Sequence, residues 1–244
     1  MRTLWSFGVA LILALASALP AYSQGQTPPL AIAVYGDSLG DGAWSGLYQI
    51  LRSNSAIHVV RHSKVGSGLT RGDYASWFAD FKADLDQSKP DIAVVMFGGN
   101  DQQSLRDENH KGYLFPTDAW KAVYAGRVDA VMSELESRQI LTVWVGLPIM
   151  RKDDLNKGAR ILDAIFAAEA EQHHITFLSL VNDFTDASGG FVAYLPDEHD
   201  HSRQIRADDG VHFTGYGYEL VAEKVWAEIQ KERAVMRPAS AVQR

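Results

Sequence analysis

The chain of 244 residues contains no cysteine. This absence excludes disulfide bonds, lipid-modified cysteine and thiolate metal sites, so stability has to come from packing. Positive charge is not in excess either, because the formal net charge is −7. Without a basic stripe that could neutralise phosphates, non-specific binding to nucleic acid is not expected. With 46% apolar residues, the chain has the composition and length of one globular domain.

Long apolar runs are absent after residue 23. The apolar stretch Leu4–Leu19 follows Arg2 and precedes the small residues of Ala21–Ser23. It is about 16 residues long, short of the ~20 that a spanning helix needs, which favours a cleaved signal peptide at 1–23 over a retained anchor. We therefore expect a secreted protein of the bacterial periplasm with no membrane span after processing.

Strands and helices alternate along the rest of the chain. Short apolar runs predict strands at 32–35, 57–60, 91–97, 140–146 and 175–180. Apolar residues at helical spacing predict helices around 44–51, 77–85, 118–138, 155–172 and 220–229, the last capped by Thr214. This order predicts a three-layer α/β/α sandwich with a five-stranded parallel sheet. The domain spans 30–234, between a polar leader at 24–29 and a flexible tail at 235–244.

A serine stands where the first predicted strand ends. Ile32–Tyr35 is the apolar run, Gly36 allows a sharp turn, and Ser38 opens the next helix. Ligands bind at the carboxyl ends of strands in open α/β sheets, where the N–H groups of a helix start favour negative charge. A hydroxyl there can act as a nucleophile, although serine is also a common helix cap.

Three further loops follow strands, so the topology places them at the same edge of the sheet. They carry the glycine loop 65–70, Asn100, and the pair Asp209 and His212. Ester cleavage needs a nucleophile, a base, a group that orients the base, and donors for the oxyanion. Ser38 can attack, His212 can take its proton, and Asp209 can fix the imidazole tautomer.

The oxyanion donors would be the N–H of Ser38, an N–H of the glycine loop and the side-chain amide of Asn100. An amide suits this role because it donates without carrying a titrating charge. Each such donor is worth on the order of 3 kcal/mol to a tetrahedral intermediate. Asp37 is expected to bond loop backbone rather than to take part in the chemistry, and Asp101 is expected to brace the loop that carries Asn100.

These motifs resemble those of a known enzyme family. Gly36–Leu39 resembles the GDSL block of the SGNH hydrolases, and Gly68, Gly99–Asp101 and Asp209–His212 resemble the other three blocks in the right order. The resemblance covers nearly all of the expected mature chain. It implies a flavodoxin-like SGNH hydrolase fold, catalysis by the serine, histidine and aspartate named above, and acyl-ester substrates.

The resemblance also bears on the glycine loop. Ser67–Thr70 aligns best with the family's glycine donor, which favours Gly68 over Gly66, although Arg61–Ser63 stands where the family often has an asparagine. More narrowly, the segments 65–69, 144–151 and 206–214 resemble a periplasmic bacterial branch of SGNH proteins, catalogued as a domain of unknown function. That likeness supplies no substrate.

Other motifs have competing interpretations. Gly36–Gly40 also fits the G-x-S-x-G elbow of α/β-hydrolases, but only one strand precedes the serine, and the acid lies three residues from the histidine. His199–His201 could bind a metal, but its polar surroundings favour a solvated turn. Arg151 follows a strand and could meet an anionic substrate group or form a surface ion pair. Trp44 and Trp77 could line a sugar site, although core packing is favoured. No metal or cofactor is implied.

The motifs together predict a secreted serine esterase that cleaves O-acyl groups, with acetyl esters of cell-envelope or extracellular carbohydrate as the expected substrates. The reaction would pass through an acyl-Ser38 intermediate. An O-acyltransferase, in which a sugar hydroxyl intercepts the same intermediate, remains open because water exclusion decides the acceptor. A third class, a non-catalytic carbohydrate-binding or assembly protein, would be favoured by a missing triad member, and none is missing.

Overall fold

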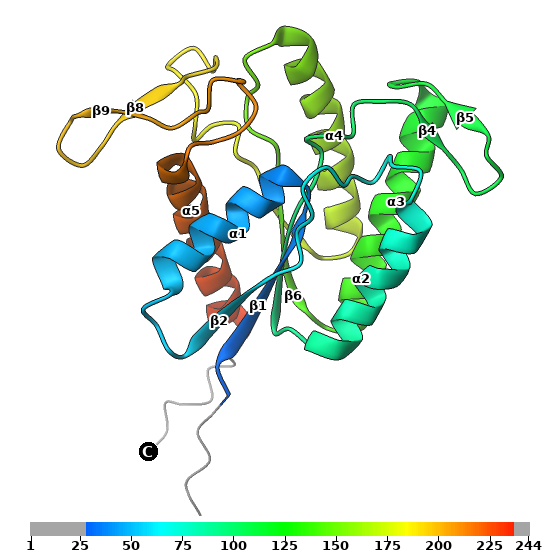
Figure 1. The fold of residues 1–244 in the computed structure, drawn as a ribbon, viewed down its shortest axis with the longest axis horizontal. Coiled ribbons are helices and arrows are strands. Elements are labelled where there is room, and N and C mark those ends of the chain that lie inside the picture. The colour runs from blue at the N-terminus through cyan, green and yellow to red at the C-terminus, as the bar shows by residue number, and fades with distance from the viewer. Residues whose placement is uncertain (1–27, 237–244) are drawn as a thin grey trace, which may run out of the picture.

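Five short strands form the central sheet of the structure, a computed structural model that describes residues 28–236 (Figure 1). In spatial order they are β2 (Ile57–Arg61), β1 (Leu30–Gly36), β3 (Ile92–Met96), β6 (Leu141–Val145) and β7 (Thr176–Leu178). All neighbours pair in parallel. The central strands β1 and β3 are the most apolar and are buried on both faces. The predicted five-stranded parallel sheet is confirmed.

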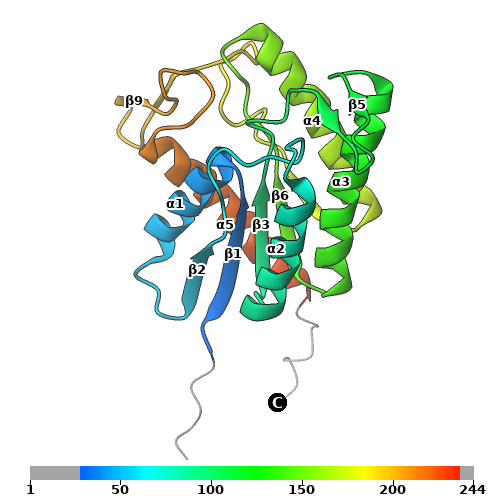
Figure 2. The ribbon, with the colours of Figure 1, turned by 45° about the vertical axis from the view of Figure 1, so that its right-hand side comes forward.

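Helices cover both faces of this sheet, as Figures 1 and 2 show. One face carries α1 (Ser38–Leu51) and α5 (Gly215–Met236), and the other carries α2 (Tyr74–Ser88), α3 (Asp118–Ser137) and α4 (Asp153–Gln172). The predicted three-layer sandwich is therefore also confirmed. Because all strands run in one direction, the loops that follow them gather at one edge, drawn at the top of Figure 2.

Polar caps fix where the helices begin. Thr117 Oγ1 accepts the Trp120 N–H at 3.3 Å at the start of α3. Thr214 Oγ1 accepts the Gly217 N–H at 3.1 Å at the start of α5, as predicted. Helix α5 continues to Met236, two residues into the predicted tail. The rest of that tail, the predicted signal peptide and most of the leader lie outside the described residues.

Two hairpins in the loops were not predicted. One joins β4 (Leu105–Arg106) to β5 (Gly112–Tyr113), and the other joins β8 (Tyr194–Pro196) to β9 (Ser202–Gln204). Both project from the edge where the parallel strands end (Figure 1). The predicted turn at His199–His201 closes the second hairpin, where Asp197 Oδ1 accepts the N–H groups of both histidines at 2.9 Å. No helix in residues 28–236 combines the length and apolarity needed to cross a membrane.

Candidate active site

Ser38 stands at the junction between β1 and α1. Gly36 has φ +154°, and a Cβ there would lie 2.1 Å from the Met96 carbonyl oxygen, so only glycine lets β1 pass β3 at this point. Asp37 then caps α1, because its Oδ1 accepts the Leu39 N–H at 2.8 Å. This turn leaves Ser38 half-buried as the first residue of the helix.

The structure brings Ser38, His212 and Asp209 together, although 174 positions separate the serine from the histidine. Ser38 Oγ lies 2.8 Å from His212 Nε2. His212 Nδ1 in turn lies 2.6 Å from Asp209 Oδ2. A neutral imidazole in this setting donates Nδ1–H to the carboxylate and accepts the serine O–H at Nε2. The arrangement can move a proton from the hydroxyl to the ring.

Asp209 is held in its ionised form by the loop that it closes. Its Oδ1 accepts the N–H groups of Val211 at 2.8 Å and His212 at 3.0 Å. Partial burial opposes ionisation, but the hydrogen bonds from the His212 ring and from these two N–H groups outweigh it and lower the pKa of Asp209 to about 2. The carboxylate therefore stays charged across the neutral range.

Arg151 packs against the same loop. Its backbone N–H donates to the Gly210 carbonyl at 3.0 Å, and its Nη1 donates to the Asp208 carbonyl at 2.6 Å. Its guanidinium also lies over the Phe191 ring, 4.9 Å from the centroid. These contacts with the loop were not foreseen from the sequence. Contact between Arg151 and an anionic substrate group stays a prediction.

Asn100 lies on the other side of Ser38, beside the glycine loop. Its Nδ2 donates to the Ser67 carbonyl at 2.9 Å, which fixes the amide and links the two loops. Within residues 28–236, the backbone N–H groups of Ser38 and Gly68 have no protein acceptor. Free donors of this kind are what an oxyanion site needs. The roles of these donors remain predictions.

Buried carboxylates hold the backbone on this side. Asp37 Oδ2 accepts the N–H groups of Gly98 at 3.1 Å and Gly99 at 2.8 Å. Burial and the neighbouring charge of Asp101 raise the pKa of Asp37 to about 7, against the pull of its hydrogen bonds. The expectation that Asp37 bonds loop backbone is therefore confirmed.

Asp101 holds the neighbouring glycine loop. It accepts the N–H groups of Leu69 at 3.1 Å and Thr70 at 3.0 Å, as well as the Tyr124 hydroxyl at 2.8 Å. Gly68 packs so closely that a Cβ there would lie 2.4 Å from Asp101 Oδ1, whereas nothing lies within 4 Å of a Cβ on Gly66. Asp101 thus fixes the loop around Gly68, a link between loops that the sequence did not reveal.

Comparisons with known proteins identify the family of this chain and its structural neighbours. The family model described as protein of unknown function, DUF459, matches residues 31–228. The chain belongs to the DUF459 family. No curated protein matches it.

Solved structures similar to this DUF459 protein include three named as lipase or esterase. A GDSL-like lipase from Bacteroides thetaiotaomicron VPI-5482 is 15% identical, with a TM-score of 0.60 over 83% of this chain and 89% of that one. The psychrotrophic esterase EstA from Pseudoalteromonas sp., in a structure inhibited by monoethylphosphonate, is 15% identical (TM-score 0.56, 84% and 99%). The acetyl xylan esterase AlAXEase is 16% identical (TM-score 0.54, 82% and 99%). The predicted SGNH hydrolase fold is confirmed.

A cavity of about 360 Å³ opens beside the glycine loop of the DUF459 protein. The backbone of 65–68 forms one wall, and Lys64, Arg71, Asp73 and Trp77 form the rest. Trp77 stacks on a buried ring of α2 and is itself only half-buried. It thus packs against the core and also lines a cavity, whereas its role in a sugar site stays a prediction.

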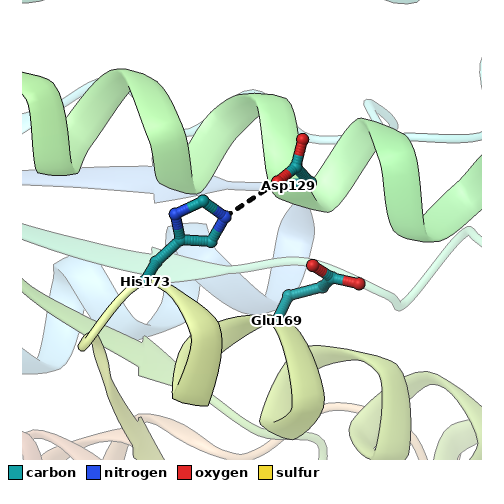
Figure 3. A group of neighbouring side chains, drawn as sticks. All are labelled: Asp129, Glu169 and His173. Atoms are coloured by element: carbon teal, nitrogen blue, oxygen red, sulfur yellow. Dashed lines mark hydrogen bonds and ion pairs between the residues drawn. The ribbon is translucent and has the colours of Figure 1, made fainter.

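One cluster outside the site could in principle hold a metal. Asp129, Glu169 and His173 offer ligand atoms within 4.8 Å of one another (Figure 3). Both ring nitrogens of His173 already face carboxylates, Nε2 at 2.8 Å from Asp129 and Nδ1 at 2.9 Å from Glu136. Burial alone would lower the pKa of His173, but the hydrogen bonds to the two carboxylates outweigh this effect, and the net pKa is raised. The cluster is therefore best described as an ion-pair network that ties α3 to α4, at the end of the molecule opposite Ser38.

Proposed function

We propose that this DUF459 protein is a secreted serine esterase that cleaves O-acyl esters, with acetyl groups on cell-envelope or extracellular carbohydrate as its substrates. The observation that carries the proposal is the connected chain from Asp209 through His212 to Ser38, with distances of 2.6 and 2.8 Å. It lies at the edge of the sheet where ligands bind in this class of fold. The named activities of the structurally similar proteins point the same way.

In the proposed reaction, Ser38 Oγ attacks the ester carbonyl carbon while its proton passes to His212 Nε2. The new C–O bond turns the carbonyl oxygen into an oxyanion. Collapse of this tetrahedral intermediate breaks the bond to the alcohol oxygen, which takes the proton from His212 and leaves. Water, deprotonated by the same ring, then attacks the carbonyl carbon of acyl-Ser38. Collapse of this second intermediate breaks the bond to Ser38 Oγ, which takes the proton back from His212, and the acid leaves. Asp209 stabilises the imidazolium that forms in each half of the reaction.

The proposed oxyanion donors are the N–H groups of Ser38 and Gly68 and the side-chain amide of Asn100. Two features support this set. The backbone donors have no protein acceptor within residues 28–236, and the Asn100 amide is fixed by its bond to Ser67. Donors held in place before the reaction stabilise the developing charge without reorganisation. Gly68 is preferred to Gly66 because Asp101 fixes its neighbours.

Carbohydrate as the alcohol component is supported by the cavity beside Gly68. It combines the partly exposed ring of Trp77 with the polar groups of Lys64, Arg71 and Asp73. An aromatic surface among polar groups suits a ligand with both apolar faces and hydroxyls. One structurally similar protein is named as an acetyl xylan esterase.

The direct test compares wild type with Ser38→Ala on 4-nitrophenyl acetate and on a panel of acetylated sugars. We expect wild-type turnover, loss of at least about 1,000-fold in kcat for the variant, and a fluorophosphonate adduct on Ser38 in wild type only. Full activity of Ser38→Ala would refute the mechanism. A folded wild type that forms no adduct and cleaves no ester would favour a non-catalytic binding protein.

Two further experiments test the remaining parts of the proposal. Product analysis with an added polysaccharide acceptor separates hydrolysis from acyl transfer. N-terminal sequencing of the exported protein tests cleavage after Ser23.

A further inference from the structure

Arg206 is completely buried beneath the loop that carries Asp209 and His212. A buried guanidinium usually pairs with a carboxylate. Here all of its acceptors are backbone carbonyl oxygens, and the nearby Asp209 pairs with His212 instead. No ion pair joins Arg206 to any acid in residues 28–236. Its partners therefore indicate what it does.

The carbonyl groups that Arg206 binds belong to the turn that presents His212. Nη2 donates to the Val211 carbonyl at 2.9 Å and the Gly210 carbonyl at 3.4 Å, and Nε lies 3.4 Å from the His212 carbonyl oxygen. Nη1 donates at 2.7 Å to the Ile149 carbonyl, in the loop that follows β6. One planar group thus fixes three consecutive carbonyls and anchors them to a neighbouring loop.

Aromatic rings hold the guanidinium from its faces. Its central carbon lies 4.9 Å from the Phe191 ring centroid and 4.6 Å from that of Phe213. Phe191 comes from the insertion between β7 and the catalytic loop, and Phe213 directly follows His212. These rings compensate part of the lost hydration and restrict the orientation of the guanidinium.

Burying the Arg206 charge costs desolvation free energy, so stability alone does not account for this arrangement. Burial lowers the pKa of Arg206 to about 10, so the side chain is still charged at neutral pH and pays for desolvation without a counter-ion. Buried charges can often be replaced by apolar groups of similar size without loss of stability. What an apolar group cannot supply is a set of donors that fixes the backbone of residues 210–212.

We propose that Arg206 is a positioning residue that keeps the His212 ring within reach of Ser38 by fixing the backbone of residues 210–212. The inference rests on the proposed function for its kinetic effect, whereas its effect on the His212–Asp209 hydrogen bond is independent of catalysis. A shift of about 1 Å in a reacting group can cost about 100-fold in rate.

The test uses Arg206→Met, which keeps the length of the side chain and removes the donors, and Arg206→Lys, which keeps the charge and one donor group. For Arg206→Met we expect kcat on 4-nitrophenyl acetate to fall about 100-fold with KM within about twofold, because ring placement and not substrate binding is disturbed. Arg206→Lys should fall between this variant and wild type. In proton NMR spectra, the low-field Nδ1–H signal of His212 should broaden or vanish in Arg206→Met.

Arg160→Met is the matched control. Arg160 also donates to backbone carbonyls, those of Leu147 and Pro148, but does not contact the catalytic loop. We expect this control to lose thermal stability and to keep both kcat and the His212 signal. If Arg206→Met keeps kcat and the His212 signal, as the control does, the proposal is wrong. If Arg206→Met fails to fold, Arg206→Lys takes its place, and wild-type kcat and signal in Arg206→Lys would refute the proposal. An inactive wild type refutes the esterase, but the proton signal still decides the role of Arg206.

Discussion

Side chains of opposite charge hold the loops on the two sides of Ser38. The loops with the proposed oxyanion donors, residues 66–70 and 98–101 (the oxyanion side), are held by the buried carboxylates of Asp37 and Asp101, which accept backbone N–H groups. The loop with the proposed base, residues 207–212 (the base side), is held by the buried guanidinium of Arg206, which donates to backbone carbonyls. In each case a charge beneath the loop satisfies backbone groups that a regular strand would have paired with its neighbour.

The difference follows from what each side has to present. Carboxylates beneath the oxyanion side satisfy the N–H groups of Leu69, Thr70 and Gly99, while those of Ser38 and Gly68, the proposed oxyanion donors, have no acceptor in the part of the chain that the structure describes. The guanidinium beneath the base side binds carbonyls instead. The N–H groups of that loop remain available to Asp209, which uses them to stay ionised. The charge of the buried side chain thus decides whether N–H groups or carbonyl groups of the loop backbone are bound.

The largest effect is expected on the base side, from Asp209→Ala. The variant loses the partner of His212 Nδ1 and the acceptor of two loop N–H groups, so both tautomer and ring position are released. We expect kcat on 4-nitrophenyl acetate to fall by about 1,000- to 10,000-fold with little change in KM. The matched control is Asp208→Ala, because among residues 28–236 the carboxylate of Asp208 accepts a hydrogen bond only from Gln204, at 3.2 Å. Equal kcat values for the two variants would remove Asp209 from the proposed mechanism.

The sequence predicted the base side only in part. The spacing of Asp209 and His212 already indicated a carboxylate bonded to an imidazole, because both residues lie within one turn. The role of Arg206 could not be read in the same way. Its polar neighbours in the chain indicate an exposed segment, and its burial depends on Phe191 and on the Ile149 carbonyl, 57 positions away. Contacts set by tertiary packing leave no local pattern.

The fold shows the same division. Short apolar runs predicted all five strands of the sheet, since the central strands β1 and β3 are buried and even the partly exposed edge strands β2 and β7 contain neighbouring apolar residues. The bounds of α3 were predicted to within one residue, because Thr117 caps it and its apolar face is regular. The hairpins β4–β5 and β8–β9 were missed, because their strands are only two or three residues long, too short to show a strand pattern in the sequence. Likewise, Asp101 was expected to bond its own loop and instead bonds the neighbouring one.

A smaller effect is expected on the oxyanion side, from Asp101→Asn. The carboxylate of Asp101 accepts from the N–H groups of Leu69 and Thr70 and from the hydroxyls of Thr70 and Tyr124. An amide retains one acceptor oxygen and turns an NH₂ group toward some of these donors. A buried donor without a partner costs about 1–3 kcal/mol, so we expect the free energy of unfolding to fall by about 3 kcal/mol. The loop around Gly68 should loosen, with kcat lower by about 10-fold.

The control for Asp101→Asn is Asp107→Asn. Asp107 also accepts two backbone N–H groups and a tyrosine hydroxyl, but it does so in the surface hairpin of β4 and β5. Water can replace these bonds, so urea unfolding should show a much smaller loss and kcat should not change. Equal losses in the two variants would mean that burial of Asp101 is not what makes its bonds important.

The smallest effect is expected from pH, which should act on one side of the site only. Burial, with the charge of Asp101, raises the pKa of Asp37 from 3.8 to about 7, so the folded protein binds more protons than the unfolded chain between these values. Stability from this group is therefore fully present below about pH 4 and is lost as pH rises toward 7. On the base side, Asp209 has a pKa of about 2 and Arg206 a pKa of about 10, so neither titrates in this range.

We expect the free energy of unfolding in urea to fall by on the order of 2 kcal/mol between pH 5 and 8, with the same slope in wild type and Asp209→Ala. Carboxyl carbon-13 spectra should show Asp37 titrating near pH 7 and Asp209 unchanged. A free energy that rises over this interval, or a slope that disappears in Asp209→Ala, would place the titrating group on the base side and reverse the comparison.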